Sequence, residues 1–224
     1  MSVLATVHLV RHGEVHNPDK VLYGRLPGFG LSDLGHQMAE SVAEWFMHRA
    51  NQLQRQPAIV AASPLLRAQQ TAAPIAAVFG NKLETELGLI EAENDFEGMS
   101  QVAATLKRSP RLWPKLRNPA RPSWGEPYTQ QVARMVEVVQ RSRDVAVDTL
   151  GPGAEAILVS HQLPIWVTRL ATEGRPLAHD PRQRECTLTS VTSLVFEQGA
   201  AVPRVEYHEP NQELLAHAAN LPGA

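Results

Sequence analysis

The first apolar run of the chain alternates and is rich in β-branched residues, which predicts a strand from Val3 to Val10. Gly13 and Pro18 follow it, so this strand is expected to end in a loop that begins with Arg11 and His12. Later runs of the same kind predict further strands at 58–63, 155–161, 187–196 and 204–209, and a brief one within 83–90.

Between these runs, apolar positions recur at helical spacing. A long amphipathic helix is predicted from a cap at Ser32 up to Pro57, a second over 65–80, and a third from residue 163. Strands that alternate with helices predict an α/β fold, a three-layer sandwich in which a mostly parallel central sheet has helices on both faces. In such sheets, binding sites lie outside the carboxyl ends of the strands.

The chain has 224 residues. This length predicts a single domain over 1–224, with a mainly helical insertion at about 99–150 that a Pro-rich segment interrupts. The insertion is basic, which is typical of a solvated face and would steer anionic substrates if it overhangs the site (Arg108, Arg111, Lys115, Arg117 and Arg121). Its aromatic residues suit ordinary packing or stacking on an organic leaving group (Trp113, Trp124 and Tyr128).

The composition narrows the classes of partner. A net charge of -2 argues against nucleic acid, because neutralising several phosphates needs a surplus of Lys and Arg. The single cysteine, Cys186, excludes an intramolecular disulfide and favours a reducing cytoplasm. The apolar start is too short to span a membrane, which takes about 20 residues. We therefore expect a cytoplasmic protein without a nucleic-acid or membrane partner, and the sequence leaves a monomer and a homo-oligomer both open.

Motifs for other phosphate and hydrolase chemistries are missing. The chain has no P-loop, no dinucleotide fingerprint and no Gly-x-Ser-x-Gly elbow. His12 and His16 are four residues apart, but Gly13 and Pro18 disfavour a helix there and no further ligand completes a metal site. We expect neither a metal nor a cofactor.

Polar residues follow three of the predicted strands where each ends: Arg11 and His12, Ser63 and Arg67, and Ser160 and His161. These ends are expected to meet at one edge of the sheet. The planar guanidinium group of arginine can donate two hydrogen bonds to phosphate oxygens, and it stays charged. A histidine beside them can attack phosphorus if a backbone carbonyl, such as that of Gly13, holds its other ring nitrogen. Ser63 is interpreted as a helix N-cap rather than a nucleophile.

The segments LVRHGE, SPLLRAQQTA, LIEAENDFEG and ILVSHQ, in this order, resemble the histidine phosphatase superfamily, specifically its phosphoglycerate-mutase-like branch, over residues 3 to about 165. The resemblance implies a covalent phosphohistidine mechanism and a small phosphorylated substrate. It implies His12 as the nucleophile, Arg11 and Arg67 as phosphate clamps, His161 as the second histidine that holds a phosphoryl oxygen, and Glu91 as the proton donor. Glu91 would need a raised pKa to protonate a leaving alkoxide.

Two residues depart from the family pattern and are candidate phosphate contacts. Asn17 lies five residues after His12, where the family often has its asparagine six residues after the nucleophile. Gln162 stands where glycine is usual after the second histidine. Several carboxylates follow Leu89, and the motif position favours Glu91 as the donor over its neighbours (Glu93, Asp95 and Glu97).

Three functions fit this pattern. A phosphomonoesterase is favoured, because the tail after Pro210 is not visibly basic and the segment after Glu91 lacks the long substrate-binding stretch of glycolytic mutases. A cofactor-dependent phosphoglycerate mutase is the alternative, and it must exclude water from the phosphohistidine. A non-catalytic phosphate-binding module is the third, although such modules typically lose a histidine or the acid.

Overall fold

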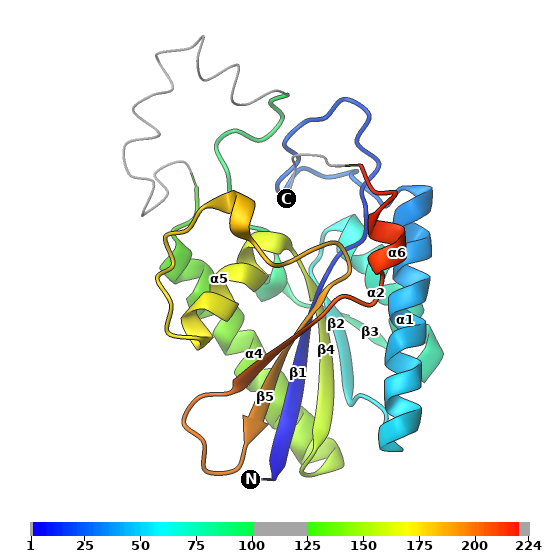
Figure 1. Ribbon diagram of the computed structural model, residues 1–224, viewed down its shortest axis with the longest axis vertical. Coiled ribbons are helices and arrows are strands. Elements are labelled where there is room, and N and C mark those ends of the chain that lie inside the picture. Colours follow the sequence, from blue (N-terminus) through cyan, green and yellow to red (C-terminus); the bar gives the residue numbers. More distant parts are fainter. Residues whose placement is uncertain (1, 101–124, 220–224) are drawn as a thin grey trace.

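A central six-stranded sheet organises the molecule (Figure 1). The computed structural model describes residues 2–100 and 125–219. The strand order is β3-β2-β4-β1-β5-β6. The strands are β1 (Val3–Arg11), β2 (Ile59–Ala62), β3 (Leu83–Thr85), β4 (Ala154–Ser160), β5 (Val191–Glu197) and β6 (Arg204–His208). The helices of four or more residues are α1 (Asp33–Leu53), α2 (Leu66–Phe79), α4 (Tyr128–Leu150), α5 (Gln162–Thr172) and α6 (Gln212–Leu215).

The register of the parallel strands brings three strand ends together. β1 pairs in parallel with β4, with Arg11 opposite Ser160, and β2 pairs in parallel with β4, with Ala62 opposite Val159. β5 runs antiparallel to β1, and β6 antiparallel to β5. The α/β fold with a mostly parallel sheet is thus confirmed. The carboxyl ends of β1, β2 and β4 lie side by side, as the prediction of a shared site requires.

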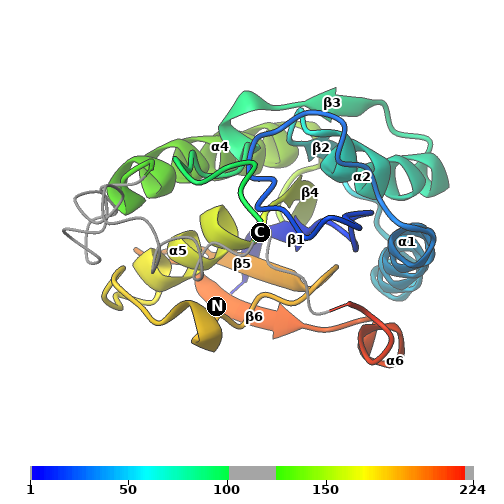
Figure 2. The same ribbon diagram turned by 90° about the horizontal axis from the view of Figure 1, so that it is seen from above.

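Helices cover both faces of the sheet (Figure 2). On one face α1 and α2 pack over a cluster that includes Val10 and Val159, and on the other α4 and α5 pack over Leu9 and Leu158. Neighbouring residues of one strand thus enter different layers, because side chains alternate across a sheet. Burial on both faces explains why β4 is buried along its whole length.

The predicted helix boundaries hold where a cap defines them. Ser32 caps α1, since its side chain accepts a hydrogen bond from the backbone N–H of Gly35. α2 ends at Gly80, whose φ of 66° is left-handed. Pro74 lies inside α2. Only 83–85 of the expected strand within 83–90 is extended, and a 3-10 helix (Leu87–Leu89) follows it.

The expected insertion divides into two parts. Residues 101–124, with the five basic residues and both tryptophans named above, lie outside the described residues. Residues 128–150 form α4, which packs against β4 and β1 as part of the layer over the sheet. Within 2–100 and 125–219, no helix has the length and apolar character that a membrane crossing demands.

Candidate active site

His12 and His161 lie next to each other at the ends of β1 and β4. Their ring centroids are 5.2 Å apart, and both side chains are fully buried. The backbone N–H of His12 donates to the carbonyl of Ser160 at 3.1 Å, which continues the parallel ladder one residue past Arg11. Two residues 149 positions apart in the chain are thus joined by the register of two strands.

The ring of His12 is oriented by the backbone. Its Nδ1 donates to the carbonyl of Gly13 at 2.8 Å, so Nε2 presents a lone pair. No described residue pairs with Nε2. Burial lowers the pKa of His12 well below 6.5, and Arg67 and Arg11 lower it further, so the ring is neutral at pH 7. A neutral, oriented imidazole has the form that a nucleophile requires.

Gly13 is needed for close packing at this turn. A Cβ there would lie 2.7 Å from the carbonyl oxygen of Gly35 in α1. The backbone N–H of Gly13 donates to Thr71 Oγ1 at 3.1 Å. α1 and α2 therefore hold the loop after β1 against the sheet edge, and with it the carbonyl that orients His12.

Ser63 orients the second histidine, so its interpretation as a helix N-cap is wrong. α2 begins after Leu65 without a side-chain cap, and Ser63 Oγ lies 2.7 Å from His161 Nε2. Ser63 Oγ also accepts a hydrogen bond of 3.4 Å from the backbone N–H of Leu65, which leaves its own proton for Nε2. We infer from this bonding that Nδ1 of His161 bears the proton, and this nitrogen has no partner among the described residues. The pKa of His161 lies well below 6.5. Burial is the largest cause, and Arg67 and His12 lower the pKa further.

Two arginines, Arg67 and Arg11, lie close enough to both histidines to lower their pKa values. The Arg67 side chain is fully buried, donates to the carbonyl of Gly24 at 2.6 Å and lies over the Tyr23 ring at 4.7 Å. Arg11 donates from Nη1 to the carbonyl of Cys186 at 2.7 Å. Nε of each arginine is buried without a partner among the described residues. Each guanidinium group thus keeps a donor free for an anion.

Glu91 is a buried carboxyl group beside this cluster. Oε1 accepts a hydrogen bond from the backbone N–H of Ala92 at 2.7 Å, while Oε2 has no partner among the described residues. Burial raises the pKa of Glu91, against the opposing effects of the Ala92 N–H and the charge of Arg67. A protonated carboxyl with one free oxygen can act as a general acid.

Comparison with known proteins defines the family. The family profile of the histidine phosphatase superfamily (branch 1) matches residues 7–207. The chain belongs to the histidine phosphatase superfamily. It is 49% identical over 205 residues to the uncharacterized protein Rv0525 of Mycobacterium tuberculosis, covering 91% of this chain and 96% of that protein.

Solved structures show the same fold. Bacillus stearothermophilus YhfR superposes with a TM-score of 0.73 at 23% identity, covering 94% of this chain and 99% of that one. The complex of mycobacterial glucosyl-3-phosphoglycerate phosphatase Rv2419c with inorganic phosphate has a TM-score of 0.71 at 22% identity, with coverage of 94% and 98%. Phosphoserine phosphatase from Entamoeba histolytica gives a TM-score of 0.70 at 20% identity, with coverage of 94% and 99%.

The two residues that depart from the superfamily pattern are both engaged within the protein. The Asn17 amide closes a loop, accepting from the backbone N–H of Val21 at 3.1 Å and donating to its carbonyl at 2.9 Å. Gln162 donates to the carbonyl of Cys186 at 3.3 Å and accepts from Arg184 at 3.2 Å. Their roles as phosphate contacts in this superfamily member stay predictions.

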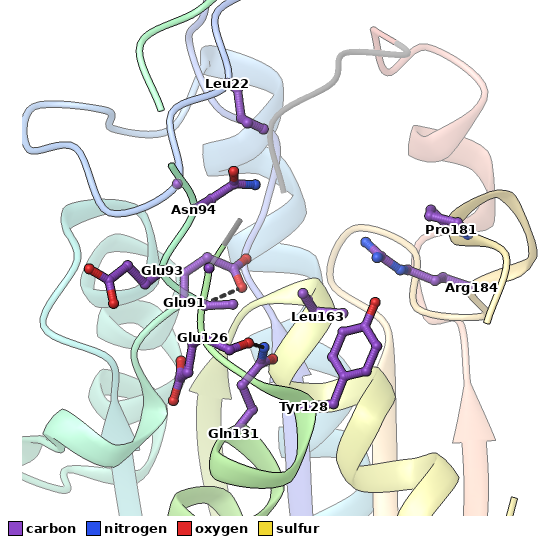
Figure 3. A pocket seen from close by; sticks show the side chains of 13 residues that line it. Leu22, Glu91, Glu93, Asn94, Glu126, Tyr128, Gln131, Leu163, Pro181 and Arg184 are labelled. Carbon is purple, nitrogen blue, oxygen red and sulfur yellow. Dashed lines mark hydrogen bonds between the residues drawn. The ribbon is translucent and has the colours of Figure 1, made fainter. Parts of the chain in front are cut away.

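Two cavities are lined by other residues of the site, and neither His12 nor His161 is among their lining residues. The first lies on the side of Glu91 (Figure 3), and the second is lined by Arg11, Tyr23 and Gln162. Sequence analysis missed Tyr23 and Arg184, because both lie in irregular loops where neither periodicity nor a family motif marks them. Among the described residues, no group of three or more His, Cys, Asp or Glu side chains could hold a metal ion.

Proposed function

We propose that the protein is a phosphomonoesterase that hydrolyses a small phosphorylated metabolite through a phosphohistidine intermediate. The observation that supports this most is the state of His12, whose Nδ1 is held by Gly13 while Nε2 is buried, unpartnered and adjacent to His161 and Arg67. Membership of the superfamily and the fold shared with proteins named as phosphatases support the same activity.

In the first half-reaction, His12 Nε2 attacks phosphorus and the bond from phosphorus to the leaving oxygen breaks. Arg11, Arg67 and the Nδ1–H of His161 hold the phosphoryl oxygens, whose charge is spread over the transition state. Glu91 gives its proton to the leaving alkoxide. The products are the alcohol, a phosphohistidine and an ionised Glu91.

In the second half-reaction, the carboxylate of Glu91 takes a proton from a water molecule that attacks the phosphohistidine. The bond from phosphorus to Nε2 breaks, phosphate leaves and Glu91 is protonated again. Burial favours the return of the proton to Glu91, because burial disfavours the charged carboxylate. One carboxyl group thus serves both steps.

A phosphatase is favoured over a mutase by the space beside Glu91. The residue lines a cavity of about 180 Å³, which has room for water next to the buried carboxyl group. A mutase must instead keep water from the phosphohistidine. Incubation with each phosphoglycerate isomer and a bisphosphate primer separates the two, since a phosphatase releases phosphate and a mutase interconverts the isomers.

Hydrolysis of p-nitrophenyl phosphate in the presence of EDTA tests the proposal. We expect phosphate release without added metal, and its loss in His12→Ala, which should also fail to acquire acid-labile label from a phosphate-labelled substrate. His36→Ala, an exposed histidine on α1, is the matched control and should retain full activity. Undiminished activity of His12→Ala would contradict the mechanism.

A phosphate-binding module would give a different result. It would be stabilised against heat by phosphate but would turn over no phosphoester in a panel read by phosphate release. The presence of both histidines, both arginines and a buried carboxyl group favours the enzyme. We further propose that it acts in the cytoplasm without a metal, a cofactor or a nucleic-acid partner.

A further inference from the structure

The cavity beside Glu91 is lined by polar side chains that have no role in the two proposed half-reactions (Figure 3). Glu91 lies on one side, and Arg184 extends toward it from the loop before β5, above Tyr128 and Leu163. The two ionisable groups are close enough for each to shift the pKa of the other, but burial raises the pKa of Glu91 and favours its neutral form, which does not neutralise Arg184. A leaving group released from His12 toward Glu91 would therefore meet Arg184.

Arg184 is held in place by neutral acceptors. Its Nε donates to His179 Nε2 at 2.9 Å, and its Nη1 donates to Gln162 Oε1 at 3.2 Å. His179 can accept because its Nδ1 donates to the carbonyl of Leu177 at 2.7 Å. These bonds orient the guanidinium group and leave its charge uncompensated.

No acidic side chain among the described residues forms an ion pair with Arg184. Residues 101–124 contain neither Asp nor Glu. The other acids of the cavity are directed elsewhere, since Glu126 pairs with Arg25 and Arg134, and Glu93 points away from the cavity (Figure 3). Arg184 is thus a partly buried cation that lacks a carboxylate partner.

A buried acceptor lies in the same cavity. Gln131 is fully buried, and its Nε2 donates to the carbonyl of Glu126 at 2.8 Å, which fixes the orientation of the amide. Its Oε1 has no partner among the described residues. A buried polar atom without a partner is costly, so both the arginine and this oxygen are suited to groups of a ligand.

We propose that Arg184 is a specificity-determining residue that binds a carboxylate on the leaving group of the substrate, with Gln131 Oε1 accepting from a hydroxyl of the same group. This inference rests on the proposed phosphatase function. The planar fork of arginine matches a carboxylate, and the partial burial of the site strengthens a charge-assisted hydrogen bond. The substrate class is then a phosphate monoester of a hydroxy acid.

Two substrates that differ only at this group test the inference. 3-Phosphoglycerate and glycerol 3-phosphate share the ester and the neighbouring hydroxyl, and differ by a carboxylate in place of CH2OH. We expect the wild type to favour the carboxylated ester by about 10- to 100-fold in kcat/KM. Arg184→Met should bring this ratio close to one, mainly through KM.

The ratio isolates binding of the carboxylate. Removing Arg184 also alters the pKa of Glu91, but that change acts on both esters and cancels in the ratio. Arg182→Met is the matched control, because Arg182 lies two residues away, is 88% exposed and pairs with Asp180. It should keep the wild-type ratio.

The outcomes separate this inference from the proposed function. A wild type that hydrolyses p-nitrophenyl phosphate but does not favour the carboxylated ester, or an Arg184→Met variant that keeps the ratio, overturns the inference alone. If no ester is hydrolysed, the proposed function is wrong. The inference about Arg184 is then tested by the increase in melting temperature that 3-phosphoglycerate and glycerol 3-phosphate each produce. A stabilisation larger than that by glycerol 3-phosphate, and lost in Arg184→Met, supports it; equal stabilisation overturns it.

Discussion

Ser63 Oγ and His161 Nε2 lie 2.7 Å apart in the buried floor of the site. The bond joins the loop after β2 to the end of β4, and it leaves Nδ1 of His161 without a partner among the described residues, available for the phosphoryl group in the proposed mechanism. The serine does not touch the substrate in the proposed mechanism. It is a positioning residue that selects the tautomer of the histidine.

Replacing this serine should reduce turnover more than binding. In Ser63→Ala, His161 can adopt either tautomer and rotate, and we expect kcat for p-nitrophenyl phosphate to fall about 10-fold, which corresponds to one lost hydrogen bond of about 1.4 kcal/mol. Ser193→Ala is the matched control, since Ser193 Oγ lies 2.8 Å from Nδ1 of buried His8, outside the site. Equal effects of the two variants on kcat would contradict the assignment.

Glu91→Gln should separate stability from activity. The raised pKa means that the folded state holds the Glu91 proton more firmly than the unfolded state, so the carboxyl lowers stability as pH rises above 4.5. Glutamine removes this cost. We therefore expect a higher melting temperature than wild type at pH 7, and no difference well below pH 4.5, where the carboxyl is protonated in both states.

The same variant should lose activity in a way that depends on the leaving group. For an alkyl phosphate we expect kcat to fall by roughly 10²- to 10⁴-fold, and for p-nitrophenyl phosphate by less, because nitrophenolate leaves without a proton. Parallel melting curves and kinetics at several pH values check both parts. A variant less stable than wild type at pH 7 would show that ionised Glu91 is stabilised by its surroundings.

The two site histidines should make the fold sensitive to acid. Their pKa values lie well below 6.5 in the folded protein, so the unfolded chain binds more protons and stability falls as pH decreases through 6.5. Each contributes up to about 1.4 kcal/mol per pH unit. In chemical unfolding from pH 7.5 to 5.5, we expect His12→Gln to show a smaller slope than the wild type, and an unchanged slope would contradict this assignment.

Glu155, at the start of β4, should stabilise the fold without serving the site. Burial alone would raise its pKa, but hydrogen bonds and charge from His8 and Arg49 outweigh burial and lower the pKa to about 2. Its stabilisation is therefore present above about pH 4.5 and is lost as pH falls toward 2. We expect Glu155→Gln to lower the free energy of unfolding by on the order of 3 kcal/mol at pH 7 and less at pH 3.

Activity provides the control for this variant. Glu155 lies at the opposite end of β4 from His161, so kcat/KM of Glu155→Gln should stay within about 2-fold of wild type at a temperature where both are folded. A large fall in kcat/KM at full folding would place this cluster in the mechanism.

The sequence by itself determined the family, the fold class and the places where the strands end. Alternation and apolar runs predict β1, β2 and β4 within a residue or two, because a strand buried on both faces requires such runs. The cap at Ser32 and the glycine after α2 define helix ends through local hydrogen bonds and backbone conformation. Patterns of this kind depend only on residues close together in the chain, so they can be read from the amino-acid sequence.

Only the tertiary structure decided which polar atoms are paired and which are free. The role of Ser63 depends on a contact with a residue 98 positions away, and Arg184 gains its place in the cavity from a loop with no periodic pattern. Burial, which sets the pKa values of His12, His161 and Glu91, is a property of the packed layers. Contacts between distant segments arise from sheet register and helix packing, and these form only when the whole chain folds.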